Sequence, residues 1–245
     1  MTTTVAVILV AGVGSRLRPL TDDKPKALVD IGGETILGRA VRLLSDYGVE
    51  RIVLATGYRE GAVRAAMQGV VPRVEYYPNP RYDSTQNSVS LALCRPGVAG
   101  EAFFKLDGDV VFQPEVLERL DASKAPLAAA LDSGRRLDEE AMKATLGEGH
   151  RIQAFGKQIA VAGSAGESIG IERISAGAAS GVFDALEAVI AEGEEQLYYE
   201  DVYSRLIASG ALQAEAVDVS DLPWTEVDDS ADLERARALL QAGSR

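Results

Sequence analysis

Two stretches near the amino terminus combine glycines, cations and prolines in a pattern that suits phosphate binding. An apolar run leads into Val10-Ala-Gly-Val-Gly-Ser-Arg-Leu-Arg-Pro-Leu-Thr21, and Lys24-Pro-Lys-Ala-Leu28 follows shortly after. Glycines directly after a strand bring backbone amides close to an anion. Arg16 and Lys26 can neutralise charge that grows in a transition state. We therefore expect a triphosphate to bind here, with Arg16 and Lys26 as catalytic cations.

Other glycine-rich sites fit this loop less well. A dinucleotide-binding fingerprint would need a third glycine near position 17, which is Leu17, and Pro19 and Pro25 oppose an immediate helix. A P-loop would need Gly-Lys-Ser/Thr, which is absent from this stretch. A tight turn with solvent-facing cations is the remaining structural alternative.

A pair of aspartates, Asp107-Gly-Asp109, follows the fourth apolar run of the chain. An Asp-Gly turn alone would explain the pattern. Carboxylates at the end of a buried strand also suit Mg²⁺, which binds one or two carboxylates together with phosphate oxygens.

Strand and helix patterns alternate in the first half of the chain, which predicts a parallel sheet with helical crossovers. After residue 125 several expected strands follow one another, including a hairpin at 147–150, before helices resume. We therefore predict an α/β fold with a Rossmann-like, mostly parallel sheet flanked by helices. The whole chain, 1–245, forms one domain in this interpretation. Its nucleotide-binding half is 1–125 and its mixed-strand, acceptor-binding half is 126–245. The expected strands are 5–10, 51–55, 73–76, 102–106, 127–131, 143–146, 151–155, 168–174 and 212–219, and the expected helices are 36–47, 60–68, 87–94, 178–192, 199–209 and 229–241.

The amino-terminal motif resembles the signature of the nucleotide-diphospho-sugar pyrophosphorylase (nucleotidyltransferase) family, Leu-Ala-Ala-Gly-x-Gly-x-Arg…Pro-Lys-Ala/Pro-Leu, with Val10 in place of one alanine. The likeness continues in Asp107-Gly-Asp109 and Trp224-Thr-Glu-Val-Asp228. It is strongest to small cytidylyltransferases that act on phosphocholine, aminoethylphosphonate or inositol 1-phosphate. The resemblance implies the GT-A-like fold of nucleotide-diphospho-sugar transferases.

The resemblance also implies roles for individual residues. Asp109 and Asp228 would bind Mg²⁺. The predicted nucleotide-binding residues are Ala11, Gly12, Gly14, Ser15, Gln86, Asn87, Ser88 and Asp107. The predicted acceptor-binding residues are Lys143, Glu167, Tyr199, Glu200 and Asp201.

The segment Tyr198-Tyr-Glu-Asp-Val-Tyr203 places aromatic and acidic groups at the start of an expected helix. Acids in a first helical turn are ordinary partners of the helix dipole. If they line the pocket, Glu200, Asp201 and the tyrosines would suit a cationic acceptor by charge and cation–π attraction.

The function that these patterns predict is Mg²⁺-dependent nucleotidyl transfer, with CTP as the favoured donor and a small phosphomonoester or phosphonate as the acceptor. A sugar-1-phosphate uridylyl- or thymidylyltransferase is an alternative of the same fold. A non-catalytic nucleotide sensor is an alternative of another class.

Composition excludes several other classes of protein. The 245 residues carry a formal net charge of −12, and 13 of the 37 acidic residues lie in 191–234 beside one base. This acidity opposes binding to nucleic acid or to an anionic membrane. No stretch approaches the roughly 18 apolar residues of a membrane span, and a single cysteine excludes an internal disulfide. We expect a cytoplasmic protein. Relatives of this family often form homodimers, although no apolar helix face in the sequence requires one.

Overall fold

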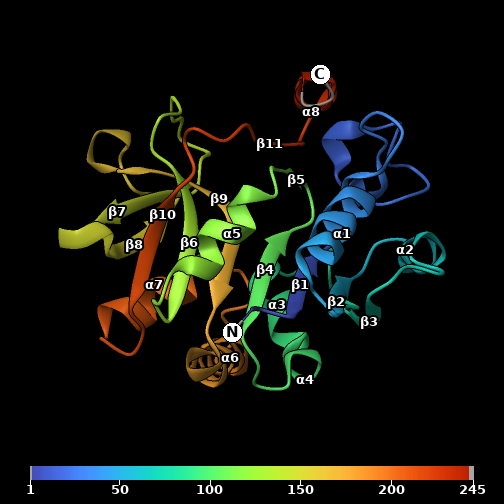
Figure 1. Ribbon diagram of the computed structural model, residues 1–245. Helices are drawn as coiled ribbons and strands as arrows, with labels where there is room; N and C mark the ends of the chain where they lie inside the picture. The colour runs from blue at the N-terminus through green and yellow to red at the C-terminus, as the bar shows by residue number, and fades with distance from the viewer. Residues whose placement is uncertain (1, 243–245) are drawn as a thin grey trace.

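The computed structural model describes residues 2–242 and is built around a nine-stranded mixed sheet (Figure 1). The order of the main strands is β10-β6-β9-β4-β1-β2-β3, with β7 and β8 joined beside β9. The strands are β1 (Val5–Leu9), β2 (Arg51–Thr56), β3 (Arg73–Pro78), β4 (Phe103–Asp107), β6 (Leu127–Asp132), β7 (Lys143–Leu146), β8 (Ile152–Gly156), β9 (Gly166–Ile174) and β10 (Ala214–Asp218).

The direction of the strands matches the prediction of a mostly parallel core with a mixed second half. Strands β4, β1, β2 and β3 run parallel to one another, and β10 is parallel to β6. Strand β9 runs antiparallel between β4 and β6, and it joins the two halves into one sheet. The expected hairpin is also present, because β7 pairs with β8 in antiparallel fashion across 147–150.

Helices cover both faces of the sheet. They are α1 (Ile36–Tyr47), α2 (Glu60–Ala66), α3 (Asn87–Leu93), α4 (Arg95–Val98), α5 (Glu115–Ala122), α6 (Ala176–Ala191), α7 (Tyr199–Ala208) and α8 (Ser230–Ala242). Along β1, Ala6 and Ile8 pack with α1, α2 and α5, while Val5 and Val7 pack with α3, α6 and α7. This alternation follows from the two-residue period of a strand. A run that is apolar at every position, as β1 is, therefore indicates burial on both faces.

Local sequence signals set the ends of the helices. Helix α1 begins after Thr35, whose Oγ1 accepts a hydrogen bond from the Gly38 amide at 3.0 Å, and it ends at Gly48 with φ 109°. Helix α7 begins with a similar cap, in which Asp201 Oδ2 accepts a hydrogen bond from the Tyr198 amide at 2.9 Å. Helix α5, which the sequence patterns did not predict, carries its apolar residues in two short clusters.

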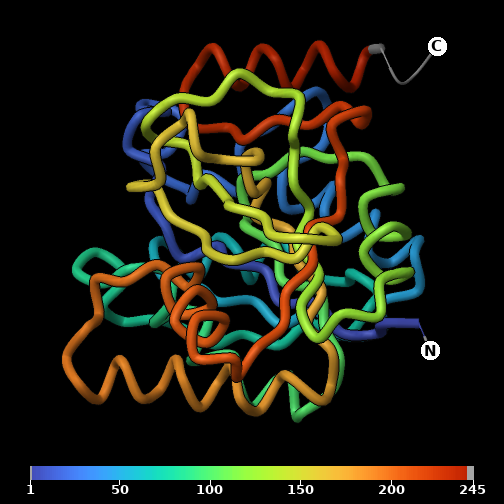
Figure 2. Tube along the Cα trace, turned by 90° about the vertical axis from the view of Figure 1, so that its left-hand side faces the viewer, coloured from blue at the N-terminus to red at the C-terminus, as the bar shows by residue number. Residues whose placement is uncertain are grey.

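A second, two-stranded sheet lies beyond the main one and pairs β5 (Val110–Val111) with β11 (Thr225–Glu226). Helix α8 follows β11 and packs on the amino-terminal loop, where Leu233 and Ala236 meet Leu17 and Val29. Figure 2 shows α8 along the top of the molecule and α6 along the bottom. No helix within residues 2–242 combines the length and apolar character needed to cross a bilayer.

Candidate functional site

Three carboxylates from distant parts of the chain meet above the end of β4. Asp109 follows β4 directly, whereas Glu226 lies in β11 and Asp228 comes two residues later. Strand β11 pairs with β5, and the Val227 amide donates to the Asp109 carbonyl at 3.0 Å. One carboxylate oxygen from each of Asp109, Glu226 and Asp228 lies within 4.8 Å of the others. The arrangement brings together the two residues predicted as metal ligands and adds a third.

These residues fit a divalent cation. Carboxylate oxygens are hard ligands of the kind that Mg²⁺ prefers. Asp109 Oδ1 is buried and has no hydrogen-bond partner among residues 2–242, as expected of an atom whose partner is an ion. Desolvation, followed by the charges of Asp109 and Asp228, raises the pKa of Glu226 to about 8. A cation would relieve this repulsion.

Sequence reasoning missed Glu226, although a signal for it was available. In Trp224-Thr-Glu-Val-Asp228 the acids alternate with residues that are buried, Thr225 and Val227. Alternation in a strand places Glu226 and Asp228 on the same face.

Lys26 lies between the two predicted ligands. Its Nζ is 2.7 Å from Asp109 Oδ2 and 2.6 Å from Asp228 Oδ1. Arg16 Nη2 donates to Asp228 Oδ2 at 3.0 Å. Burial opposes the positive charge of Lys26, but the two aspartates outweigh it and raise its pKa above the ordinary value. Both predicted catalytic cations are therefore at the carboxylate cluster.

Gly14 explains how the loop presents Lys26. Its φ is 70°, and a Cβ at this position would lie 2.5 Å from Lys26 Cβ. Thr21 Oγ1 donates to the Gly14 carbonyl at 2.9 Å and holds the turn. Gly12 is different, because a Cβ there would meet nothing within 4 Å and the residue lines the cavity described next.

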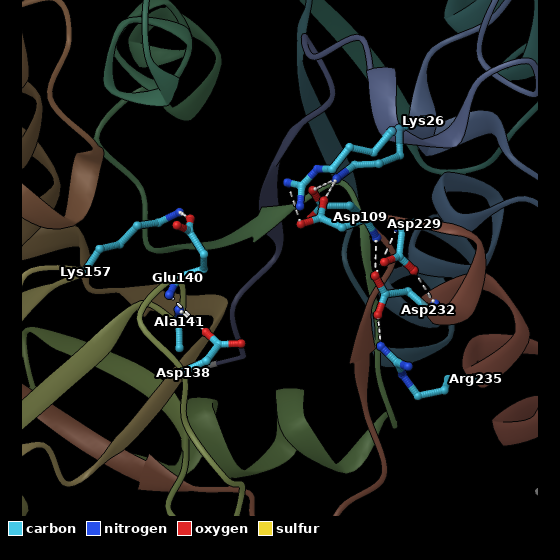
Figure 3. A network of polar contacts seen from close by, with 11 residues as sticks. Lys26, Asp109, Asp138, Glu140, Ala141, Lys157, Asp229, Asp232 and Arg235 are labelled. Carbon is cyan, nitrogen blue, oxygen red and sulfur yellow. Dashed lines mark hydrogen bonds and ion pairs between the residues drawn. The ribbon is translucent and has the colours of Figure 1, made fainter. Parts of the chain in front are cut away.

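A cavity of about 600 Å³ opens between the two halves of the chain. Figure 3 shows Lys157, Glu140, Ala141 and Asp138 on one side of it, facing Lys26, Asp109, Asp229, Asp232 and Arg235 on the other. Its size is within the range of small-molecule sites. The predicted site residues that line it are Ala11, Gly12, Arg16, Gln86, Asn87, Asp107, Asp109, Glu167, Glu200 and Asp228.

Three predicted nucleotide-binding residues are not on the wall of the cavity. Gly14 packs against the side chain of Lys26. Ser15 is exposed at the start of the 3₁₀ turn Ser15–Leu17. Ser88 is fully buried, and its hydroxyl donates to the Leu197 carbonyl at 2.7 Å. In the structure Gly14 and Ser15 shape the loop and Ser88 fixes the segment before α7, and their contact with a nucleotide stays a prediction.

A buried polar cluster lies beneath the cavity wall. Lys105 in β4 is fully buried, with Nζ 3.1 Å from Asp107 Oδ1 and 3.0 Å from Glu172 Oε2. The ammonium group is 3.5 Å from the centroid of the Tyr199 ring, and the Tyr199 hydroxyl donates to Asp107 Oδ2 at 2.9 Å. A Cβ on Gly170 would lie 2.4 Å from the same Asp107 oxygen, so Asp107 requires a glycine there.

This cluster holds more negative than positive charge. Asp107, Glu172 and Glu200 surround Lys105, and burial is the main cause that raises the pKa of all three carboxyl groups, against the opposing charge of Lys105. The pKa of Glu172 rises to about 7 and that of Glu200 to about 8. Glu200 Oε2 is buried without a hydrogen-bond partner among residues 2–242, yet Glu200 lines the cavity. The sequence patterns did not single out Lys105 or Glu172, because both lie in strands identified by their apolar neighbours.

Three of the predicted acceptor-binding residues do not line the cavity. Lys143 is 1% exposed, and its Nζ donates to the carbonyls of Asp138, Glu139 and Ala141 at 3.1, 3.0 and 2.9 Å. Because these bonds use all three ammonium protons, Lys143 fixes the loop before β7 instead of facing an acceptor. Asp201 caps α7, and Tyr199 lies beneath the wall, whereas its neighbour Tyr198 lines the cavity.

Comparisons with known proteins agree with this geometry. CMP-5'-(3-aminopropyl)phosphonate synthase from Streptomyces rubellomurinus is 33% identical over 94% of this chain and 38% of its own length. A bifunctional IPC transferase and DIPP synthase from Aquifex aeolicus is 30% identical over 96% of this chain and 51% of its own length. The chain thus spans about half or less of these relatives.

A solved structure and a family model cover most of the chain. The inositol-1-phosphate CTP transferase from T. maritima has a TM-score of 0.82 over 98% of this chain and 97% of its own, at 24% identity, which shows a shared fold. The model of the MobA-like NTP transferase domain matches residues 6–206. By this match and by the site that its fold assembles, the chain belongs to the MobA-like NTP transferase domain family.

Proposed function

We propose that this protein is a Mg²⁺-dependent cytidylyltransferase that transfers CMP from CTP to a small phosphonate or phosphomonoester. The observation that carries the proposal is the meeting of Asp109, Glu226 and Asp228 with Lys26 and Arg16 at one edge of the cavity. The relatives named for aminopropylphosphonate and for inositol 1-phosphate support this choice of donor and acceptor.

In the reaction an oxygen of the acceptor's phosphate or phosphonate attacks the α-phosphorus of CTP. The bond from that phosphorus to the bridging oxygen breaks, and pyrophosphate leaves. The attacking oxygen is already anionic near neutral pH, so positioning and charge neutralisation are the main requirements. Bound Mg²⁺ would neutralise phosphate charge and orient the phosphates, held by Asp109, Asp228 and Glu226. Lys26 and Arg16 would contact the phosphate oxygens beside it.

The nucleoside would lie on the amino-terminal side of the cavity. The Ala11 and Gly12 backbone lines this side, and the side chains of Gln86 and Asn87 supply amide donors and acceptors. Asn87 is held in place because its Oδ1 accepts a hydrogen bond from the Tyr199 amide at 3.0 Å. A pyrimidine edge could pair with these groups.

The acceptor would extend toward Glu200 and Tyr198. A buried carboxylate oxygen without a partner, such as Glu200 Oε2, is costly unless a cation or a proton reaches it. An ammonium group entering from the cavity would pair with Glu200 and approach the Tyr198 ring. We therefore favour an acceptor that carries a positive charge at the end opposite its phosphonate or phosphate, such as an aminoalkylphosphonate.

Pyrophosphate release tests the proposal. The protein is incubated with Mg²⁺ and each of CTP, UTP, dTTP and ATP against 2-aminoethylphosphonate, 3-aminopropylphosphonate, phosphocholine, inositol 1-phosphate and glucose 1-phosphate. We expect release with CTP and an ammonium-bearing acceptor. Release with UTP or dTTP and glucose 1-phosphate would establish the sugar-nucleotide alternative. Nucleotide binding without release from any pair would support a non-catalytic sensor.

The substitution Glu200→Gln tests the orientation of the acceptor. At pH 8.5, above the pKa of about 8, it removes the carboxylate charge and preserves the shape, so KM for 2-aminoethylphosphonate should rise about tenfold or more. KM for propylphosphonate, in which a methyl group replaces the ammonium, should change little. Glu192→Gln, an exposed position after α6, is the matched control. Equal effects of Glu200→Gln on the two phosphonates would refute the contact with the ammonium group.

A further inference from the structure

Arg135 lies on the acceptor side of the cavity in the loop between β6 and β7, and no sequence motif singled it out. Asp132, at the end of β6, holds this loop. Its Oδ1 accepts hydrogen bonds from the amides of Gly134 at 2.9 Å and Arg135 at 3.1 Å. Its Oδ2 accepts a hydrogen bond from Trp224 Nε1 at 2.7 Å. One buried carboxylate therefore fixes both the backbone of Arg135 and the nearby indole ring.

The guanidinium group of Arg135 lies over that indole. Arg135 Cζ is 4.6 Å from the centroid of the Trp224 ring, within the range of cation–π attraction. Stacking restricts the side chain, so less conformational entropy is lost when the guanidinium binds a ligand. The loop thus holds a planar cation at the cavity wall before any substrate is present.

This guanidinium has spare hydrogen-bonding capacity. Its nearest carboxylate oxygen is Glu167 Oε2, 3.5 Å from Nε, and it donates no hydrogen bond to any side chain or carbonyl of residues 2–242. Other arginines in this acidic protein make short two-pronged pairs, such as Arg119 with Asp221 at 2.6 and 2.7 Å. An arginine on a cavity wall that lacks such a pair can offer two parallel N–H donors to an incoming anion.

The other cationic side chains near the cavity already contact carboxylates or carbonyls, or lack the two parallel donors. Arg16 contacts the metal ligand Asp228, and Arg235 pairs with Asp232 on α8. Lys157 lies 3.8 Å from Glu140 and over the Tyr198 ring, and its ammonium is a point charge without the two-pronged geometry. Lys143, expected to serve the acceptor, is fully used by backbone carbonyls.

We propose that Arg135 binds the phosphonate or phosphate group of the acceptor through paired hydrogen bonds and sets the direction from which its oxygen approaches CTP. This inference rests on the proposed function. Arg135 and Glu200 would then recognise the two ends of a zwitterionic acceptor, with the cation of the protein at the anionic end. The guanidinium would move from the vicinity of Glu167 onto the ligand, while the Trp224 ring keeps it at the wall.

Steady-state kinetics of four variants test the assignment. Arg135→Gln should raise KM for 2-aminoethylphosphonate by about 10- to 100-fold, the range for losing hydrogen bonds to a charged group. KM for CTP should change less than about twofold, because the triphosphate lies at Arg16 and Lys26. KM for 2-aminoethylphosphonate in Arg135→Lys should lie between the values for wild type and Arg135→Gln, since lysine keeps the charge and loses the two parallel N–H donors. Arg136→Gln removes the same charge from the next residue, which is exposed and off the cavity wall, and should behave as wild type. Lys157→Gln should raise KM for the acceptor less than Arg135→Gln does.

Calorimetry gives a readout independent of turnover. Binding of 2-aminoethylphosphonate is measured in the presence of Mg²⁺ and a non-hydrolysable CTP analogue, and Arg135→Gln should weaken it by the same factor as KM. Thermal unfolding of each variant confirms that it is folded. Unchanged acceptor affinity in Arg135→Gln, a rise in KM for CTP instead, or a larger effect of Lys157→Gln would each overturn the assignment. Normal turnover in Arg135→Gln would contradict the role of Arg135 and would not affect the proposed function. If the wild-type protein showed no turnover, the proposed function would be wrong, and calorimetry alone would test whether Arg135 binds the acceptor.

Discussion

At the scale of single residues, Lys26 lies between Asp109 and Asp228, with its Nζ 2.7 and 2.6 Å from their carboxylate oxygens. An ammonium group on a flexible stem can leave such a position when a divalent cation arrives, and it can then contact phosphate oxygens. Lys26 would thus neutralise the aspartates when no substrate is bound and the triphosphate when it is bound.

Replacing Asp109 tests this exchange. Asp109→Ala removes a metal ligand and one partner of Lys26, so kcat should fall at least about a hundredfold, comparable with the loss of one preorganised electrostatic group. The melting temperature should stay close to wild type, because Asp228 still pairs with Lys26 in the variant. Asp46→Ala, at an exposed position of α1, is the control. Full activity of Asp109→Ala would contradict the metal assignment.

The buried carboxyl group of Glu200 makes stability depend on pH. Burial is the main cause that raises its pKa to about 8, with Lys105 opposing. Between the ordinary pKa of a glutamate and 8, the folded state therefore holds more protons than the unfolded state, and the free energy of unfolding falls as pH rises. This contribution is fully present near pH 4 and is lost as pH passes 8.

Glu200→Gln should remove this dependence. Its melting temperature should exceed that of wild type at pH 8.5 by about 2–4 °C for each kcal/mol of relieved burial cost. The difference should shrink toward pH 5, where wild-type Glu200 is protonated and resembles glutamine. Melting curves from pH 5 to 8.5 measure it, with Glu192→Gln as the control. A difference that does not vary with pH would contradict the raised pKa.

At the scale of elements, two glycines of one loop have separate tasks. Gly14 adopts a positive φ and packs against the stem of Lys26, whereas Gly12 borders open space in the cavity. Gly14→Ala should destabilise the protein by about 1 kcal/mol or more, since an alanine is strained there, and kcat should fall because Lys26 shifts. Gly12→Ala should leave stability nearly unchanged and raise KM for CTP. Thermal melts and kinetics of both variants separate the two effects. Similar stability losses at both glycines would contradict this division.

The elements also show what the sequence can and cannot predict. The apolar runs of β1, β2, β4 and β6 and the bounds of α1 were predicted, because burial and the helical spacing of apolar residues leave a pattern at short range. The antiparallel direction of β9 was not readable, since a strand pairs across the sheet without marking its direction in its own residues. Strand β5 and strand β11 have two residues each, too few for any period.

In the candidate site, too, residues in local motifs were predicted and residues that depend on distant partners were not. Asp109, Asp228, Arg16 and Lys26 were predicted from motif and resemblance, and they meet in the structure. Arg135 escaped notice because its task depends on a ring that lies 89 positions away along the chain. The burial of Lys143 was not predicted, because the residues of its own strand give no sign of the three carbonyls that accept its hydrogen bonds.

At the scale of the whole molecule, α8 ties the end of the described chain to its beginning. Leu233 is 3% exposed and packs in a small apolar cluster with Leu17 and Val29, next to the loops that carry Arg16 and Lys26. Asp232 Oδ2 also accepts hydrogen bonds from the amides of Asp228 and Asp229, each at 3.0 Å. The helix therefore positions Asp228, a predicted metal ligand, and packs against the glycine-rich loop.

Leu233→Ala should lower both the stability of the protein and its affinity for Mg²⁺. A buried leucine replaced by alanine costs about 2–5 kcal/mol, and the metal ligands should become less ordered, so the Mg²⁺ concentration for half-maximal rate should rise. Leu93→Ala, at a position that is 37% exposed, should change neither property appreciably. Denaturant unfolding and Mg²⁺ titration of the rate measure the two effects. A destabilised Leu233→Ala protein with an unaltered Mg²⁺ requirement would show that α8 does not support the ligand.

The meeting of Lys26 with Asp228 has a consequence for the protein during its synthesis. These partners are 202 positions apart, and β11 must pair with β5 before they can meet. A nascent chain emerging from the ribosome presents its glycine-rich loop and Asp109 early, yet lacks Glu226 and Asp228 until translation has passed β10. A ribosome-bound chain stalled before β11 would therefore lack two of the three carboxylates of the site, and the proposed nucleotidyl transfer should be absent until those residues have been made.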